Sequence, residues 1–131
     1  MTPGSMGSMD TSDIKAWMRA TRERVGLTQK DVADLAGVTV DMVKKWESEK
    51  YVSPPADVIL MLQAALDRHR RAVTEIVDDH IGDDQATLTY YRSQAQAGDI
   101  GTTVGIADAR IREVSAILER AGTTIDYTYP R

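Results

Sequence analysis

The chain contains no cysteine and no phenylalanine, and only two histidines. Without cysteine it can form no disulfide framework, no cysteine-based zinc site and no thiol nucleophile. Two histidines argue against a histidine-rich metal centre, and no apolar run approaches the roughly 20 residues of a membrane-spanning helix. A hydrophobic core must therefore hold the fold, and 131 residues suffice, because a chain of this size buries roughly two-thirds of its unfolded surface.

The composition is that of a folded protein preceded by a short polar segment. Hydrophobic residues make up 42% of the chain and charged residues 27%, which argues against global disorder. Residues 1–12 are small, polar and rich in methionine, and they lack the apolar stretch of a secretory signal. We interpret 1–12 as a disordered tail or an expression scar. With no targeting or membrane segment, the sequence predicts a cytoplasmic protein of bacterial or viral origin.

Charge is divided unevenly along the chain. The net charge of −4 by itself speaks against a nucleic-acid-binding protein. Residues 13–71, however, hold 11 lysines and arginines against 9 acidic residues, whereas residues 72–131 hold 5 against 10. The first half could therefore face phosphate while the second faces away. Two ordinary solvated surfaces would give the same distribution, so charge alone does not decide.

The first part of the chain is predicted to form short helices separated by glycine. Apolar residues recur with helical spacing over 13–25, 28–36 and 39–47. Gly26 and Gly37 offer left-handed ends after the first two segments. The second and third segments each open with a threonine, whose hydroxyl can cap a helix N-terminus.

The second part is predicted to form a long helix, either one straight rod or bent near Arg68–Arg71, and a small α+β unit. Two prolines at 54–55 are typical of a helix start, and no glycine or proline interrupts the helical spacing from there to Ile81. Beyond Gly82 the pattern predicts a strand, a helix and a second strand, with 93–105 left unassigned. The three predicted elements cover 86–91, 106–121 and 123–129.

The segment from Leu27 to Glu47 carries the clearest chemical signal. Two short helices meet at a tight turn at Gly37, and small Ala33 lets them approach closely. Val40, Asp41, Lys44 and Lys45 are predicted on the outward face of the second helix, while Val43 and Trp46 pack inward. A helix presented in this way fits the major groove of DNA. The alternative is a plain helical hairpin that serves only packing.

This segment and its flanks resemble the Cro/cI-type (XRE-like, lambda-repressor-like) helix–turn–helix regulators. More narrowly, 13–122 resembles the YdiL-like regulators, which include autorepressors found beside anti-CRISPR genes. The narrower likeness rests on Trp46–Lys50, the two prolines, the long helix, and Thr87–Tyr91. The matching residues of the broader family are Arg22, Gly26–Gln29, Val32–Ala33, Gly37–Thr39, Val43 and Trp46–Ser48.

The resemblance implies a fold and a division into domains. The fold class is mainly α: a lambda-repressor-like helix–turn–helix bundle, a long helix, and a small C-terminal α+β dimerisation unit. Residues 13–81 are expected to form the DNA-binding domain with its long fourth helix, and 82–131 the dimerisation domain. Two strands are too few to bury both of their faces within one chain. We expect a second subunit to cover the remaining apolar positions, Leu88 or Tyr91 together with Ile125, Tyr127 and Tyr129.

The resemblance also implies DNA contacts at the start of two helices. Gln29 opens the second helix, where its side chain and the nearby N–H groups can reach a phosphate. Thr39 caps the third helix and either contacts phosphate as well or serves as a cap alone. Val40 is expected to touch a thymine methyl group. Asp41 either accepts a hydrogen bond from cytosine N4 or only stabilises the positive end of the helix dipole.

Lysines supply the remaining expected contacts. Lys44 and Lys45 can each reach guanine or phosphate, unless they form only a solvated face. The family's glycine after the third helix is replaced here by Glu49, and Lys50 is expected to offset that acidic residue as a phosphate contact. A structural ion pair is expected between Arg22 in the first helix and the glutamate at position 47.

Two function classes remain open at this stage. The first is a sequence-specific repressor that binds a palindromic double-stranded DNA operator as a homodimer. The second is an antitoxin-like or other interaction module whose C-terminal part binds a partner protein. No nucleophile–base set or phosphate loop stands out, so we expect neither an enzyme nor a cofactor nor a metal. His69 fits a packed core position, and Tyr90 and Tyr91 fit opposite faces of a strand better than an RNA-stacking pair.

Overall fold

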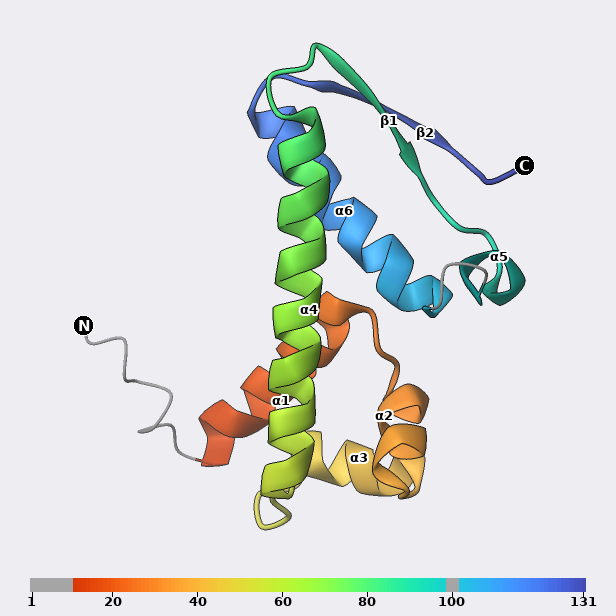
Figure 1. Ribbon diagram of the computed structural model, residues 1–131. Helices are drawn as coiled ribbons and strands as arrows, with labels where there is room; N and C mark the ends of the chain where they lie inside the picture. Colours follow the sequence, from red (N-terminus) through yellow and green to blue (C-terminus); the bar gives the residue numbers. More distant parts are fainter. Residues whose placement is uncertain (1–10, 99–101) are drawn as a thin grey trace, which may run out of the picture. The chain divides into compact units, whose positions relative to one another are not determined.

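A computed structural model describes residues 11–98 and 102–131 (Figure 1). The chain divides into two compact units, with the boundary after Ala64. The boundary falls inside the long helix α4, Ala56–His80, so the two halves of that helix belong to different units. The domain limits expected from the sequence, 13–81 and 82–131, remain predictions. The predicted tail at 1–12 lies mostly outside the described residues, and the first helix begins within it at Thr11.

The N-terminal unit contains three short helices and the start of α4. They are α1 (Thr11–Val25), α2 (Gln29–Ala36) and α3 (Val40–Ser48). Each agrees with its predicted segment to within two residues at either end. The helices enclose a core of Met18, Val25, Val32, Ala33, Val43, Trp46, Val58 and Leu62. The inward positions predicted for α3, Val43 and Trp46, are therefore confirmed.

Helix α4 is a single helix of 25 residues that begins directly after the two prolines. Proline has a preset φ angle and lacks only an N–H donor that the first helical turn leaves unpaired. The helix ends before Gly82, whose φ of +90° is left-handed. Among the described residues no helix is both long enough and apolar enough to span a bilayer.

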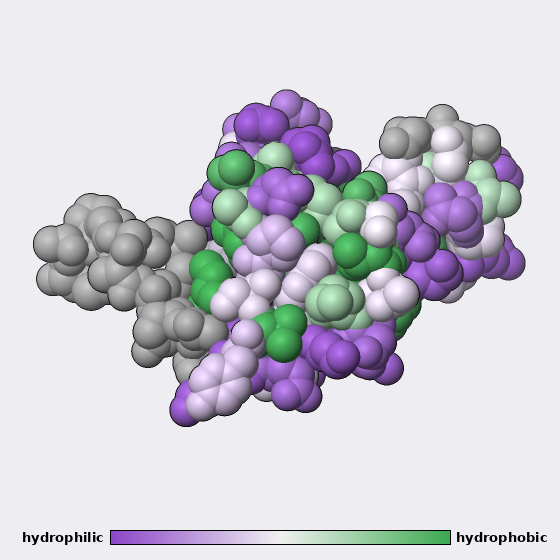
Figure 2. Space-filling model, turned by 90° about the horizontal axis from the view of Figure 1, so that it is seen from below, coloured by the Kyte–Doolittle hydropathy of each residue, from purple (hydrophilic) through white to green (hydrophobic). Residues whose placement is uncertain are grey.

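The exposed surface of the molecule mixes hydrophobic and hydrophilic groups. Seen from below, it shows separate hydrophobic patches with hydrophilic side chains around them (Figure 2). In the N-terminal unit, the large hydrophobic side chains that remain exposed are Leu35, Met42, Tyr51 and Leu60. They come from different elements.

The C-terminal unit contains two strands joined by a helical connection. Strand β1 (Gln85–Thr89) is followed by the short helix α5 (Gln94–Gly98), helix α6 (Val104–Arg120) and strand β2 (Thr124–Thr128). The strands pair in parallel, with Gln85 opposite Thr124 and Thr89 opposite Thr128. Parallel strands need a crossover between them, which α5 and α6 supply. Helix α5 and the start of α6 occupy the predicted unassigned segment, of which 99–101 lie outside the described residues.

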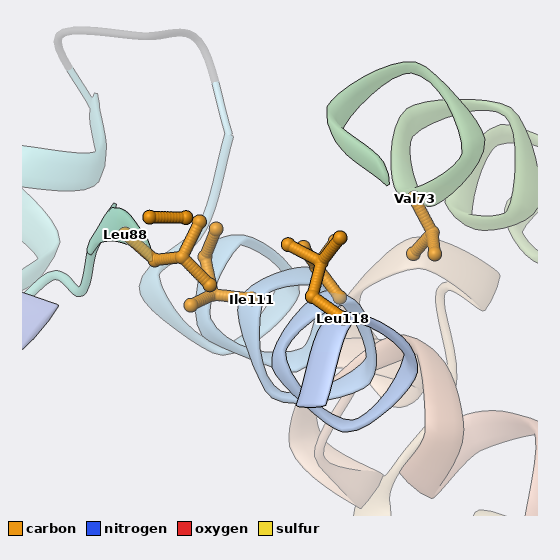
Figure 3. Packing of buried hydrophobic residues seen from close by; sticks show 6 residues of the cluster. Val73, Leu88, Ile111 and Leu118 are labelled. Atoms are coloured by element: carbon orange, nitrogen blue, oxygen red, sulfur yellow. The ribbon is translucent and has the colours of Figure 1, made fainter. Parts of the chain in front are cut away.

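The core of this unit joins α4, β1 and α6. Val73 of α4 points toward Leu118 of α6, while Leu88 of β1 lies beside Ile111 (Figure 3). Ala86 and Val114 complete the buried cluster, and Ile125 packs against it half-buried. Helix α6 of the same chain therefore covers Leu88 and leaves it only 2% exposed. The expectation that a second subunit covers Leu88 is wrong.

Candidate DNA-binding surface

The turn between α2 and α3 is built from hydrogen bonds that the sequence encodes locally. Thr28 and Asp31 form a reciprocal capping box: the Thr28 N–H donates to Asp31 Oδ2 at 2.8 Å and the Asp31 N–H to Thr28 Oγ1 at 3.0 Å. Gly37 ends α2 at φ +70°, a left-handed conformation that residues with a Cβ rarely adopt. Thr39 then caps α3 by accepting a hydrogen bond from the Met42 N–H at 3.2 Å.

Helix α3 presents one face to solvent and buries the other. Val43 and Trp46 are buried, whereas Asp41, Lys44 and Lys45 are exposed. Val40, at the first turn, is half-buried. The exposed side chains are those for which the sequence predicts contacts with bases, and the contacts themselves remain predictions.

The two lysines of α3 differ in their surroundings. Lys45 Nζ lies 3.3 Å from Asp41 Oδ2, one turn earlier on the same exposed face. Asp41 also lies in the first turn of α3, where a carboxylate is favourable, and both of its predicted functions remain predictions. The Lys44 ammonium makes no ion pair with any residue that the structure describes.

An ion pair joins α1 to the end of α3. Arg22 Nε donates to Glu47 Oε2 at 2.7 Å and Arg22 Nη2 to Glu47 Oε1 at 3.1 Å, so the contact is bidentate. The side chains are only 10% and 4% exposed. Arg22 Nη1 also donates to the Leu27 carbonyl at 3.1 Å. The pair therefore ties α1, the loop before α2 and α3 together.

Gln29 is part of the same network. Its Nε2 donates to Glu47 Oε1 at 3.2 Å, and the residue is half-buried. The side chain thus contacts the ion pair in this structure, while the N–H groups of the first turn of α2 remain the more direct candidates for a phosphate. The sequence analysis did not anticipate this contact, because it depends on where α3 crosses α2.

Lys15 makes buried contacts with the end of α3 that the sequence analysis missed. It lies in α1 and is 6% exposed, and its Nζ donates to the Trp46 carbonyl at 3.0 Å. The same ammonium contacts the carbonyl oxygens of Lys45 and Val52. Helical spacing could not reveal this role, since the position falls between the apolar positions Ile14 and Trp17.

The loop after α3 begins at Glu49. This residue ends the helix with an extended backbone, φ −86° and ψ 125°. Lys50 Nζ lies 5.4 Å from the centroid of the Tyr51 ring, within cation–π range. The Tyr51 ring itself is almost fully exposed. Lys50 is therefore at the surface, as a phosphate contact requires.

A second surface lies in the C-terminal unit and is rich in tyrosine. Tyr90, Tyr127 and Tyr129 line an open hollow of about 380 Å³ together with Arg112 and Thr128. The rings of Tyr90 and Tyr127 meet edge to face, with centroids 6.2 Å apart. Arg112 Nη1 donates to the Tyr90 hydroxyl at 2.9 Å. Tyr127 and Tyr129 are 55% and 50% exposed.

Tyr91 lies apart from this tyrosine hollow. It lines a separate depression of about 190 Å³ with Arg110, and its backbone N–H donates to Asp108 Oδ1 at 2.8 Å. Tyr90 and Tyr91 therefore line different hollows, but both follow the end of β1 at Thr89, so they do not occupy the two faces of a strand as predicted.

The capped helices α2 and α3, the tight turn between them and the exposed lysines of α3 together define a helix–turn–helix domain. In this class the second helix enters the major groove of DNA. The family model described as helix-turn-helix matches residues 18–72. The match supports the resemblance to the XRE-like, Cro/cI-type domains and a DNA-binding regulator. No curated protein and no solved structure matches the chain.

Proposed function

We propose that this protein is a transcriptional repressor that binds a palindromic operator as a homodimer and inserts α3 into the major groove. The observation that carries the proposal is the exposed face of α3, with Lys44 and Lys45 on a helix held in place by the buried Arg22–Glu47 pair. The helix must be rigid, because the protein distinguishes one base pair from another only when its side chains are held opposite the donors and acceptors of the base edges. The protein would act in the cytoplasm.

The expected contacts divide into positioning and specificity. Lys50 and the first turn of α2 contact phosphate, which sets the orientation of the domain on the duplex. Lys44 and Lys45 contact guanine in the groove, and Val40 touches a thymine methyl group. To bind DNA, Lys45 must first break its ion pair with Asp41. The narrower resemblance to YdiL-like autorepressors favours an operator in the protein's own promoter.

The homodimer is proposed to form through the tyrosine hollow. Exposed tyrosine and arginine side chains are typical of interface centres, because each offers a large contact area with a polar end. Both strands of the two-stranded sheet also have a free edge, which pairing with a second copy would satisfy. A closed dimer presents two copies of α3 to successive major grooves, about 34–36 Å apart on a palindrome.

Selection of bound duplexes from a random DNA pool tests this function. We expect a palindromic consensus, whose affinity falls steeply with salt because the protein neutralises phosphates. Sedimentation of the free protein should give a dimer. A protein that selects no sequence is not a specific regulator. A monomer that binds DNA poorly would instead favour the alternative, an antitoxin-like module whose tyrosine hollow receives a partner protein.

A further inference from the structure

Lys15 belongs to α1, yet its ammonium group lies at the C-terminal end of α3. Nζ donates to the Trp46 carbonyl at 3.0 Å and the Lys45 carbonyl at 3.5 Å, and it contacts the Val52 carbonyl as well. Three carbonyls from the helix end and the following loop thus converge on one buried cation. Removing a charged amine from water is costly unless such acceptors compensate it, so this placement is specific.

The Lys15 ammonium lies where the end of α3 needs a hydrogen-bond donor. The last carbonyls of a helix have no partner within the helix and carry partial negative charge. The Lys45 carbonyl accepts the Glu49 N–H at 2.8 Å, so the Trp46 carbonyl is the one for which Lys15 is the main donor. Many helices close them with a left-handed residue, usually glycine, whose following backbone N–H groups turn back. After α3 the backbone is extended at Glu49 instead. Lys15 therefore supplies, from another helix, a hydrogen-bond donor of the kind that a glycine cap provides through the backbone, and it adds a positive charge.

We propose that Lys15 is a positioning residue for DNA binding, which fixes the end of α3 and the turn 49–52. The inference rests on the proposed function. Lys15 is buried and does not itself contact DNA; it acts through the carbonyls that it holds. The residues positioned in this way are the lysines on either side of the helix end, Lys45 before it and Lys50 after it.

The turn 49–52 has little else to hold it. Its backbone makes one hydrogen bond within the turn, from the Val52 N–H to the Glu49 carbonyl at 3.2 Å, and one to the helix, from the Glu49 N–H to the Lys45 carbonyl at 2.8 Å. The contact of Lys15 with the Val52 carbonyl anchors the far side of the same turn. Without Lys15, Lys50 would sample many positions, and its phosphate contact would have to be ordered at the moment of binding.

The test compares full-length wild type with Lys15→Met on the duplex that wild type selects from a random pool, over a series of salt concentrations. We expect Lys15→Met to bind roughly tenfold more weakly, with a salt slope about 0.9 smaller in magnitude, which corresponds to one phosphate contact. Backbone relaxation measured by NMR should show increased motion confined to 49–52.

Rescue separates positioning from a general loss of stability. A glycine at position 49 can adopt the left-handed conformation and close the helix end by itself. Glu49→Gly should therefore restore affinity and salt slope in the Lys15→Met background by more than it changes them in wild type, which a double-mutant cycle measures. Arg19→Met is the matched control, because it removes an exposed cation from the same helix and should leave both quantities nearly unchanged.

Each outcome bears on the inference. The inference is overturned if Lys15→Met binds the duplex with the affinity and salt slope of wild type. It is also overturned if Lys15→Met loses affinity but Glu49→Gly raises the affinity no more in that background than in wild type. If Lys15→Met does not fold, Lys15→Gln, a shorter neutral donor, takes its place, and full affinity there is equally decisive. If wild type selects no duplex, the proposed function fails as well, whereas failure of the variants alone leaves that function standing.

Discussion

At the scale of single residues, the contact between Arg22 and Glu47 is the most consequential polar interaction of the N-terminal unit. Replacing Glu47 by alanine leaves the Arg22 guanidinium buried without its carboxylate, and Gln29 loses the same acceptor. We expect Glu47→Ala to lower the free energy of unfolding by about 3–5 kcal/mol. Thermal unfolding followed by circular dichroism measures it, and operator affinity should fall in parallel because α3 loses its brace.

An exposed pair of the same chemistry provides the control. Glu23 pairs with Arg19 on the surface of α1, where both side chains are more than half exposed. Exposed pairs of this kind contribute about 0–1 kcal/mol, so Glu23→Ala should change the unfolding curve little. Equal effects of Glu47→Ala and Glu23→Ala would contradict the assignment of the buried pair as a brace.

The two lysines of α3 should respond differently to substitution. A lysine that contacts a base edge contributes to specificity, so Lys44→Ala should weaken operator binding roughly tenfold to a hundredfold and affect random DNA less. Lys45→Ala should cost less, because Lys45 must first leave Asp41 in order to bind. Binding to operator and random duplexes at two salt concentrations separates the two roles.

Asp41, the acidic partner of Lys45 on α3, can be tested by substitution as well. Asp41→Asn frees Lys45 and removes a charge that phosphate repels, so binding to random DNA should strengthen. Operator binding that strengthens by the same factor would show that Asp41 contacts no base. Specific loss of operator binding would instead assign it the cytosine contact.

At the scale of elements, the core between α4, β1 and α6 gives the C-terminal unit its stability. Leu118 is fully buried there, and Leu88 lies in the same cluster. Leu118→Ala should lower the free energy of unfolding by about 2–5 kcal/mol, as expected for a buried leucine that leaves a cavity. Amide hydrogen exchange should show the loss in 65–131 and little change in α1–α3. Ile117→Ala, on the exposed side of the same helix, should have a much smaller effect.

The elements also show what a sequence can reveal. The N-terminal helices were predictable because their ends carry local signals: Gly26, Gly37, the capping threonines and the two prolines. The ion pair of Arg22 and Glu47 was expected only through family resemblance. The parallel pairing of β1 and β2, and the position of α5 between them, depend on contacts distant in sequence that no local pattern specifies. Lys15 and the inward turn of Gln29 were missed for the same reason.

At the scale of the whole molecule, charge explains why one copy should bind DNA weakly. The half of the chain that contains α3 has only a small excess of positive charge, and the C-terminal half is acidic. A single domain with few phosphate contacts gains little from counterion release. Two domains linked in one assembly raise the effective concentration of the second into the millimolar range, which increases operator affinity without any new contact.

The proposed dimer is therefore testable through surface residues distant in sequence from α3. Tyr127 and Tyr129 are about half exposed in one chain, so the double substitution Tyr127→Ala and Tyr129→Ala should leave each unit folded. We expect the variant to sediment as a monomer and to bind the palindromic operator at least tenfold more weakly, because linkage between the two DNA-binding domains is lost. Its affinity for a single half-site should match that of wild type. Tyr51→Ala, which removes a more exposed tyrosine from the other unit, should remain dimeric. A double variant that stays a tight dimer with full operator affinity would place the interface away from the tyrosine hollow.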